Sequence, residues 1–96
     1  MGQNTQTKKQ TKANAKQVIE RTQTGVRIET RMLKVLKALA EYLDMTLGDL
    51  LEGIVLHAFE GKAPFGAESL GKIRALREVY GLTLTAEDSH QLEERG

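Results

Sequence analysis

The chain has 96 residues, enough for one small domain, with 14 Lys and Arg residues against 13 Asp and Glu residues. It has no cysteine, which excludes disulfides and thiolate metal sites, and its two histidines, His57 and His90, form no ligand motif. We therefore expect neither a metal nor a cofactor. The absence of an 18-residue apolar run and of a hydrophobic leader predicts a cytoplasmic protein with no membrane partner.

Charge is divided unevenly along the chain. Residues 1–37 hold nine basic and two acidic residues, a net charge of +7, whereas residues 38–96 hold five basic and eleven acidic residues, a net charge of −6. Such asymmetry is typical of a protein whose basic end meets a polyanion. The alternative is a solvated tail joined to an acidic globule.

Residues 1–20 consist largely of Gln, Thr, Asn and Lys. They cannot bury enough apolar surface to offset chain entropy, so they are predicted to form a disordered basic arm. Its cations, together with the next arginine along the chain, are candidate phosphate ligands: Lys8, Lys9, Lys12, Lys16 and Arg21. The alternative is an ordinary solubilising tail.

Residues 22–28 show the period of two that is typical of a half-buried strand. The inner and outer sets are Thr24, Val26 and Ile28 against Gln23, Gly25 and Arg27. No second strand follows within hairpin distance, and a lone strand leaves its backbone groups unpaired. We therefore expect this strand to pair with the same strand of a second copy.

From about Thr30, a candidate N-cap, the apolar period becomes helical and continues to about residue 43. After a short break, Thr46 with Asp49 predicts the start of a second helix, which ends near Gly61. Apolar residues cover so much of this second helix that we expect it to be buried on more than one side. The first helix also carries three cations that are either solvated or in contact with the polyanion: Arg31, Lys34 and Lys37.

A third helix is predicted over residues 67–80, ended by Gly81. Thr85 with Asp88 then indicates a weak final turn or helix reaching about Glu94. No catalytic constellation occurs anywhere in the chain, so we expect a protein that is not an enzyme.

The order strand, helix, tight turn, helix over residues 22–61 resembles the ribbon-helix-helix family, the Arc/MetJ superfamily of DNA-binding proteins. The resemblance is carried by residues 24–28, 32–40 and 43–51. Glu29-Thr30 departs from it, because many relatives have proline at this junction. The resemblance implies a mainly α fold, in which one N-terminal strand from each protomer pairs with its counterpart in an intertwined dimer. The chain would then consist of three parts: a basic arm (1–20), the ribbon-helix-helix domain (21–61) and a helical C-terminal extension (62–96).

In such a ribbon the outward residues Gln23, Gly25 and Arg27 would face base edges in the major groove. Arg27 could bond guanine bidentately and Gln23 could bond adenine, each pair discriminating by about 1–3 kcal/mol. The alternatives are a phosphate or solvent contact for Arg27. Gly25 would serve either close backbone approach to DNA or a β-bulge.

The start of the second helix, at Thr46, Leu47 and Gly48, is a second candidate anion site, because free backbone N–H groups and the helix dipole favour a phosphate. By resemblance, it would clamp DNA beside the ribbon. The alternative is plain capping by Thr46, and Asp49 would weaken phosphate binding. The expected dimer core comprises Val26, Ile28, Leu36, Leu39, Leu50 and Ile54.

These expectations together predict a homodimeric, sequence-specific double-stranded DNA-binding protein, a transcriptional regulator of the repressor type that is associated with the nucleoid. The resemblance leaves open an antitoxin, with a protein partner bound at residues 62–96, or a plasmid-partition or DNA-transfer accessory protein. A rival from another class is a helical protein-interaction module without specific DNA binding.

Overall fold

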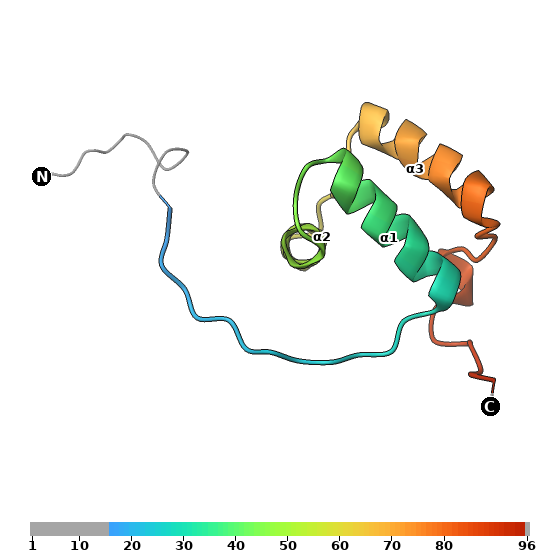
Figure 1. The fold of residues 1–96 in the computed structure, drawn as a ribbon, viewed down its shortest axis with the longest axis horizontal. Helices are drawn as coiled ribbons and strands as arrows, with labels where there is room; N and C mark the ends of the chain where they lie inside the picture. Colours follow the sequence, from blue (N-terminus) through green and yellow to red (C-terminus); the bar gives the residue numbers. More distant parts are fainter. Residues whose placement is uncertain (1–15, 96) are drawn as a thin grey trace, which may run out of the picture.

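The computed structural model describes residues 16–95. An extended segment, residues 16–29, leads into three helices, α1 (Thr30–Tyr42), α2 (Leu47–Phe59) and α3 (Ala67–Tyr80), followed by a short 3₁₀ helix, η2 (Ala86–Asp88). In Figure 1 the extended segment passes below α2 and reaches the start of α1. None of the helices in this part of the chain is both long enough and apolar enough to span a membrane.

The expected N-terminal strand is wrong, and with it the ribbon-helix-helix fold class and the strand-paired dimer. Residues 16–95 contain no β-strand. Thr24 is exposed and Val26 is 75 % exposed, so the alternating pattern does not produce a buried face. The physical reason is that extended backbone becomes a strand only when another strand supplies the hydrogen-bond ladder, and the described part of the chain holds no such partner.

The sequence indicated Thr30 as the cap of α1. In the structure, Glu29 caps this helix instead. The Glu29 carboxylate accepts a hydrogen bond from the Met32 amide at 2.8 Å and another from Arg31 Nε at 3.0 Å. Both hydrogen bonds favour the ionised carboxylate and so lower the pKa of Glu29. The bond from the Met32 amide has the larger effect. A carboxylate also suits the positive end of the helix dipole, so Glu29 takes the capping role.

The predicted start of α2 is confirmed, since Thr46 Oγ1 accepts a hydrogen bond from the Asp49 amide at 3.0 Å. The preceding break turns at Asp44, whose φ is 58°, and the chain leaves α2 through Gly61, at φ 70°. Glycine adopts this left-handed conformation without steric cost.

The helix predicted over residues 67–80 is also confirmed, and Gly81 ends it at φ 67°. The Thr85–Asp88 capping signal is present, with the Thr85 amide 2.8 Å from Asp88 Oδ2. However, the regular turn stops at Asp88 and does not reach Glu94. His90 takes a positive φ of 66°, which ends helical geometry there.

The core lies where α1 packs against α2 and α3. Its buried centre is Leu39, Ala40 and Leu50, with half-buried side chains packed around it: Leu36, Leu43, Ile54, Phe65, Ile73 and Leu76. Four of the residues expected in a dimer core, Leu36, Leu39, Leu50 and Ile54, therefore belong to the core of a single chain. Because Phe65, Ile73 and Leu76 also contribute, residues 62–80 are part of the same folded unit.

Candidate nucleic-acid interface

The extended segment ahead of α1 contains the longest run of exposed residues in the described chain. Every residue from 16 to 27 is exposed. The radius of gyration is 17.1 Å, against about 12 Å for a compact chain of this length. The segment is therefore presented to solvent along one side of the helices and is not folded into them (Figure 1).

One apolar side chain of the segment lies beside α2. Ile19 lines a shallow apolar pocket together with Leu51, Val55 and Leu56 of that helix. Ile19 remains 56 % exposed, so it covers this surface only partly. Ile19 falls in the arm that the sequence predicts to be disordered, so this position beside α2 was not expected, although the apolar Val18-Ile19 pair inside a polar tract was a visible signal.

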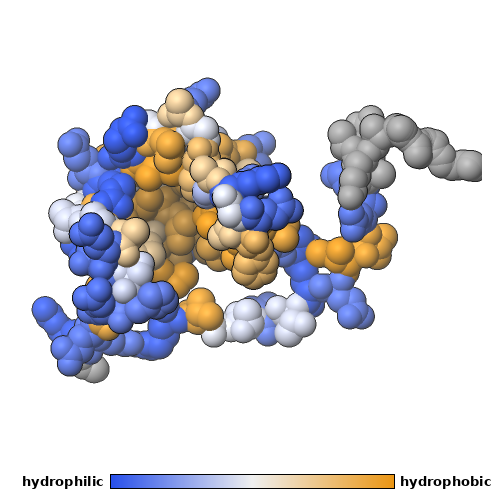
Figure 2. Space-filling model, turned by 180° about the vertical axis from the view of Figure 1, so that it is seen from behind, coloured by the Kyte–Doolittle hydropathy of each residue, from blue (hydrophilic) through white to orange (hydrophobic). Residues whose placement is uncertain are grey.

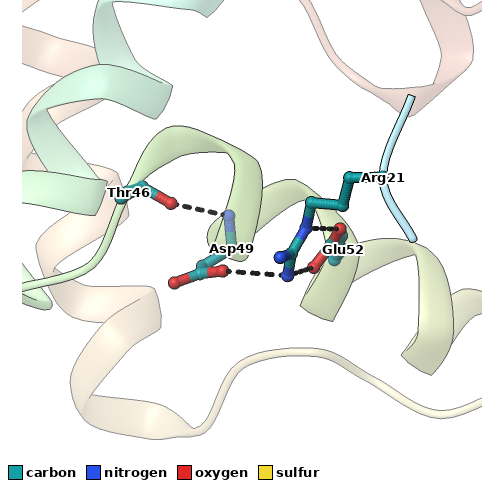
Figure 3. A network of polar contacts seen from close by, with 4 residues as sticks. All are labelled: Arg21, Thr46, Asp49 and Glu52. Carbon is teal, nitrogen blue, oxygen red and sulfur yellow. Dashed lines mark hydrogen bonds and ion pairs between the residues drawn. The ribbon is translucent and has the colours of Figure 1, made fainter. Parts of the chain in front are cut away.

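An ion pair holds the segment two residues further on. Arg21 donates from Nε to Glu52 Oε2 at 2.8 Å and from Nη2 to Glu52 Oε1 at 2.9 Å, and its Nη2 lies 3.7 Å from Asp49 Oδ1 (Figure 3). The hydrogen bond between the side chains is the main cause that raises the pKa of Arg21 and lowers that of Glu52. The structure thus brings a predicted phosphate ligand to the predicted phosphate site at the start of α2.

The start of α2 is accessible but electrostatically mixed. Gly48 is exposed, and a Cβ added there would meet only Thr46 Oγ1, at 3.9 Å, so a ligand could approach the backbone closely. Thr46 Oγ1 already accepts a hydrogen bond from the Asp49 amide. Two carboxylates, Asp49 and Glu52, flank this end of the helix and oppose an anion unless Arg21 compensates for them.

The three predicted base-reading residues, Gln23, Gly25 and Arg27, are all exposed. Nothing lies within 4 Å of a Cβ added at Gly25, so packing within the chain does not require glycine there. Since the segment is not a strand, a β-bulge no longer explains this residue.

Arg27 contacts the other end of the chain. Its Nε donates to Glu94 Oε1 at 3.2 Å, and its Nη2 pairs with Glu94 Oε2. This hydrogen bonding raises the pKa of Arg27. The sequence offered no signal for the contact, because 67 residues separate the two side chains.

The remaining predicted cations differ in their surroundings. Lys16, Lys34 and Lys37 are exposed. Arg31 bonds the Gly81 carbonyl at 2.9 Å as well as Glu29, so its role is structural. Three lysines of the predicted arm lie outside the described residues: Lys8, Lys9 and Lys12.

An apolar face on α2 is left largely uncovered. Val55, Leu56 and Phe59 are 43 %, 63 % and 81 % exposed, and Leu50 is the only fully buried residue of this helix. Figure 2 shows apolar surface over α2 and toward the middle of the molecule. The expectation that α2 is buried on more than one side is therefore not met within one chain.

No cluster of His, Asp or Glu among residues 16–95 has the arrangement of a metal site. His57 points back along its own helix, with Nδ1 2.7 Å from the Gly53 carbonyl oxygen, and remains exposed. No protein-family model, curated protein or solved structure matches the chain. Its charge and geometry must therefore carry any functional conclusion.

Proposed function

We propose that this chain binds double-stranded DNA through its basic N-terminal part, acts as a homodimer and regulates transcription. The observation that carries the proposal is the unbroken exposure of residues 16–27, which continue a tract rich in lysine. A basic, extended and exposed chain is suited to follow a polyanion because its side chains reach phosphates without unfolding the core.

The segment has the length and the side chains for this role. An extended chain advances about 3.3 Å per residue, so the eleven steps from the Cα of Lys16 to that of Arg27 span roughly 36 Å, close to one helical turn of DNA. Lysines of the N-terminal tract, with Lys16, would contact phosphates and supply affinity. Gln23 and Arg27 would contact base edges, with the Arg27 fork pairing bidentately with guanine.

A second copy of the chain is the partner that best fits the uncovered face of α2. Only five hydrophobic residues are fully buried within residues 16–95: Val35, Leu39, Ala40, Leu50 and Leu82. Small domains without disulfides commonly gain stability by association, and this chain has no cysteine. Val55, Leu56 and Phe59 would give a two-fold dimer a self-complementary apolar patch.

Fluorescence anisotropy with a labelled 30-base-pair duplex at low salt tests DNA binding. We expect Lys9→Gln with Lys12→Gln to weaken binding several-fold, because two phosphate contacts are lost. A matched double variant, Lys62→Gln with Arg74→Gln, removes the same charge from the helical part and should bind nearly as well as the unmodified chain. Equal losses in both variants would show that only net charge matters.

Sedimentation velocity tests the dimer. Leu56→Glu should produce a folded monomer, since its side chain is 63 % exposed in one chain. Val79→Glu on α3, 72 % exposed, serves as the control and should leave the dimer intact. A monomeric unmodified chain would remove the homodimer from the proposal.

A protein-interaction module is the second candidate function, and the same α2 face favours it. A monomer that shows no DNA affinity at low salt would support this candidate. In that outcome, Leu56 and Phe59 would be available to a different protein and the basic tract would serve solubility.

A further inference from the structure

The C-terminal residues are held against the start of α1 by specific contacts. Leu82 is buried, with only 7 % of its surface exposed. The Gly81 carbonyl accepts from Arg31 Nη1 at 2.9 Å and the Leu84 carbonyl accepts from Arg77 Nη2 at 2.8 Å. Because Arg31 lies on α1 and Arg77 on α3, these bonds fix the path along which the chain leaves the helices.

The residues that follow carry mostly negative charge. Residues 86–95, which we call the acidic tail, contain four carboxylates and one arginine: Glu87, Asp88, Glu93, Glu94 and Arg95. The capping box of η2 and a bond from the Gln91 side chain to the Glu87 carbonyl at 3.1 Å order the first part of this tail. Its end lies close to the segment that precedes α1 (Figure 1), where Glu94 meets Arg27.

The Arg27–Glu94 contact uses the donors that a nucleic acid would need. Both Nε and Nη2 of Arg27 face the two oxygens of one carboxylate. A guanine edge or a phosphate presents a similar pair of acceptors to an arginine fork. The carboxylate and the DNA cannot occupy this fork together.

We propose that the acidic tail competes with DNA for Arg27 through Glu94 and so lowers the DNA affinity of the free protein. This inference rests on the proposed DNA-binding function and assigns a role to the end of the chain. The side chains of Arg27 and Glu94 are 84 % and 59 % exposed, so solvent screens the pair and DNA can displace it. The competition is therefore expected to be modest, on the order of two- to fivefold in affinity.

Glu94→Gln removes the competing charge, and Glu93→Gln is the matched control. Glu93 makes no hydrogen bond or ion pair within residues 16–95, yet its loss changes the net charge equally. In anisotropy with a 30-base-pair duplex, Glu94→Gln should tighten binding about two- to fivefold more than Glu93→Gln. In an Arg27→Ala background the two variants should bind alike, because the contested fork is gone.

A readout without DNA makes the outcomes separable. The NMR signal of the Arg27 Nε–H should move in Glu94→Gln and stay in place in Glu93→Gln. If DNA binds but the two variants have equal affinities, the competition is overturned and DNA binding stands. If no variant binds DNA while the Arg27 signal still responds to Glu94→Gln, the proposed function and the competition both fail, and the contact is structural only.

Discussion

Arg21 and Glu52 lie 31 residues apart in the sequence, yet they form a two-point hydrogen bond at 2.8 and 2.9 Å. The pair links the extended basic segment to α2 beside the first turn of that helix (Figure 3). Together with the apolar pocket that Ile19 lines beside α2, it sets the position of the segment on the folded part of the chain.

Glu52→Gln should loosen this attachment. We expect backbone order parameters from ¹⁵N relaxation to fall for residues 17–22, because the charge-assisted bonds from Arg21 are weakened. Glu60→Gln is the control, since Glu60 pairs with its near neighbour Lys62 at 3.1 Å. Unchanged order parameters in Glu52→Gln would mean that Ile19 alone holds the segment.

The two helix starts should respond differently to alanine. Thr46→Ala should lower the free energy of unfolding by about 1 kcal/mol, the typical cost of losing a hydroxyl cap. Thr30→Ala should cost much less, because Glu29 occupies the capping position of α1. Urea denaturation of both variants measures the difference, and a larger loss for Thr30→Ala would restore threonine as the cap.

Acid should remove part of the stability of α1. The folded state lowers the pKa of Glu29 below the ordinary value of 4.5, so its contribution is present above that pH and is lost as pH falls through the folded pKa. The pKa of Glu52 is also lowered, so its contribution to stability is lost in acid in the same way. As pH falls below 4.5, the Tm of Glu29→Gln should therefore decrease less steeply than the Tm of the unmodified chain. Parallel decreases in Tm would contradict the capping role.

Truncation of a side chain to alanine should lower the free energy of unfolding much more in the core than in the extended segment. Leu39→Ala should cost about 2–5 kcal/mol, because Leu39 is only 2 % exposed at the junction of the helices. Val26→Ala should stay within about 0.5 kcal/mol, the usual range for an exposed site. A Val26 cost comparable to that of Leu39 would show that this side chain is buried in the protein in solution.

Local signals in the sequence predicted the helices well. Thr46 with Asp49, Gly61 and Gly81 act within one turn of chain, so the start of α2 and the ends of α2 and α3 could be read directly. The cap of α1 was misplaced by one residue because two adjacent polar side chains, Glu29 and Thr30, could both serve.

Contacts between distant residues could not be predicted in this way. The strand depended on a pairing partner that the alternation itself cannot supply, and the described chain contains none. The pairs of Arg21 with Glu52 and of Arg27 with Glu94 join residues 31 and 67 positions apart. Their effect on the candidate site is large, because they occupy two arginines that the sequence presents as free ligands.

The salt dependence of DNA binding tests the central claim most directly. With a duplex chosen by selection from a random pool, the logarithm of the association constant should fall linearly with the logarithm of salt concentration, by about 0.9 for each phosphate contact. We predict a slope equivalent to several contacts, and a loss of sequence preference in Arg27→Ala. No binding at low salt, or a slope near zero, would contradict the proposal that this chain is a DNA-binding protein.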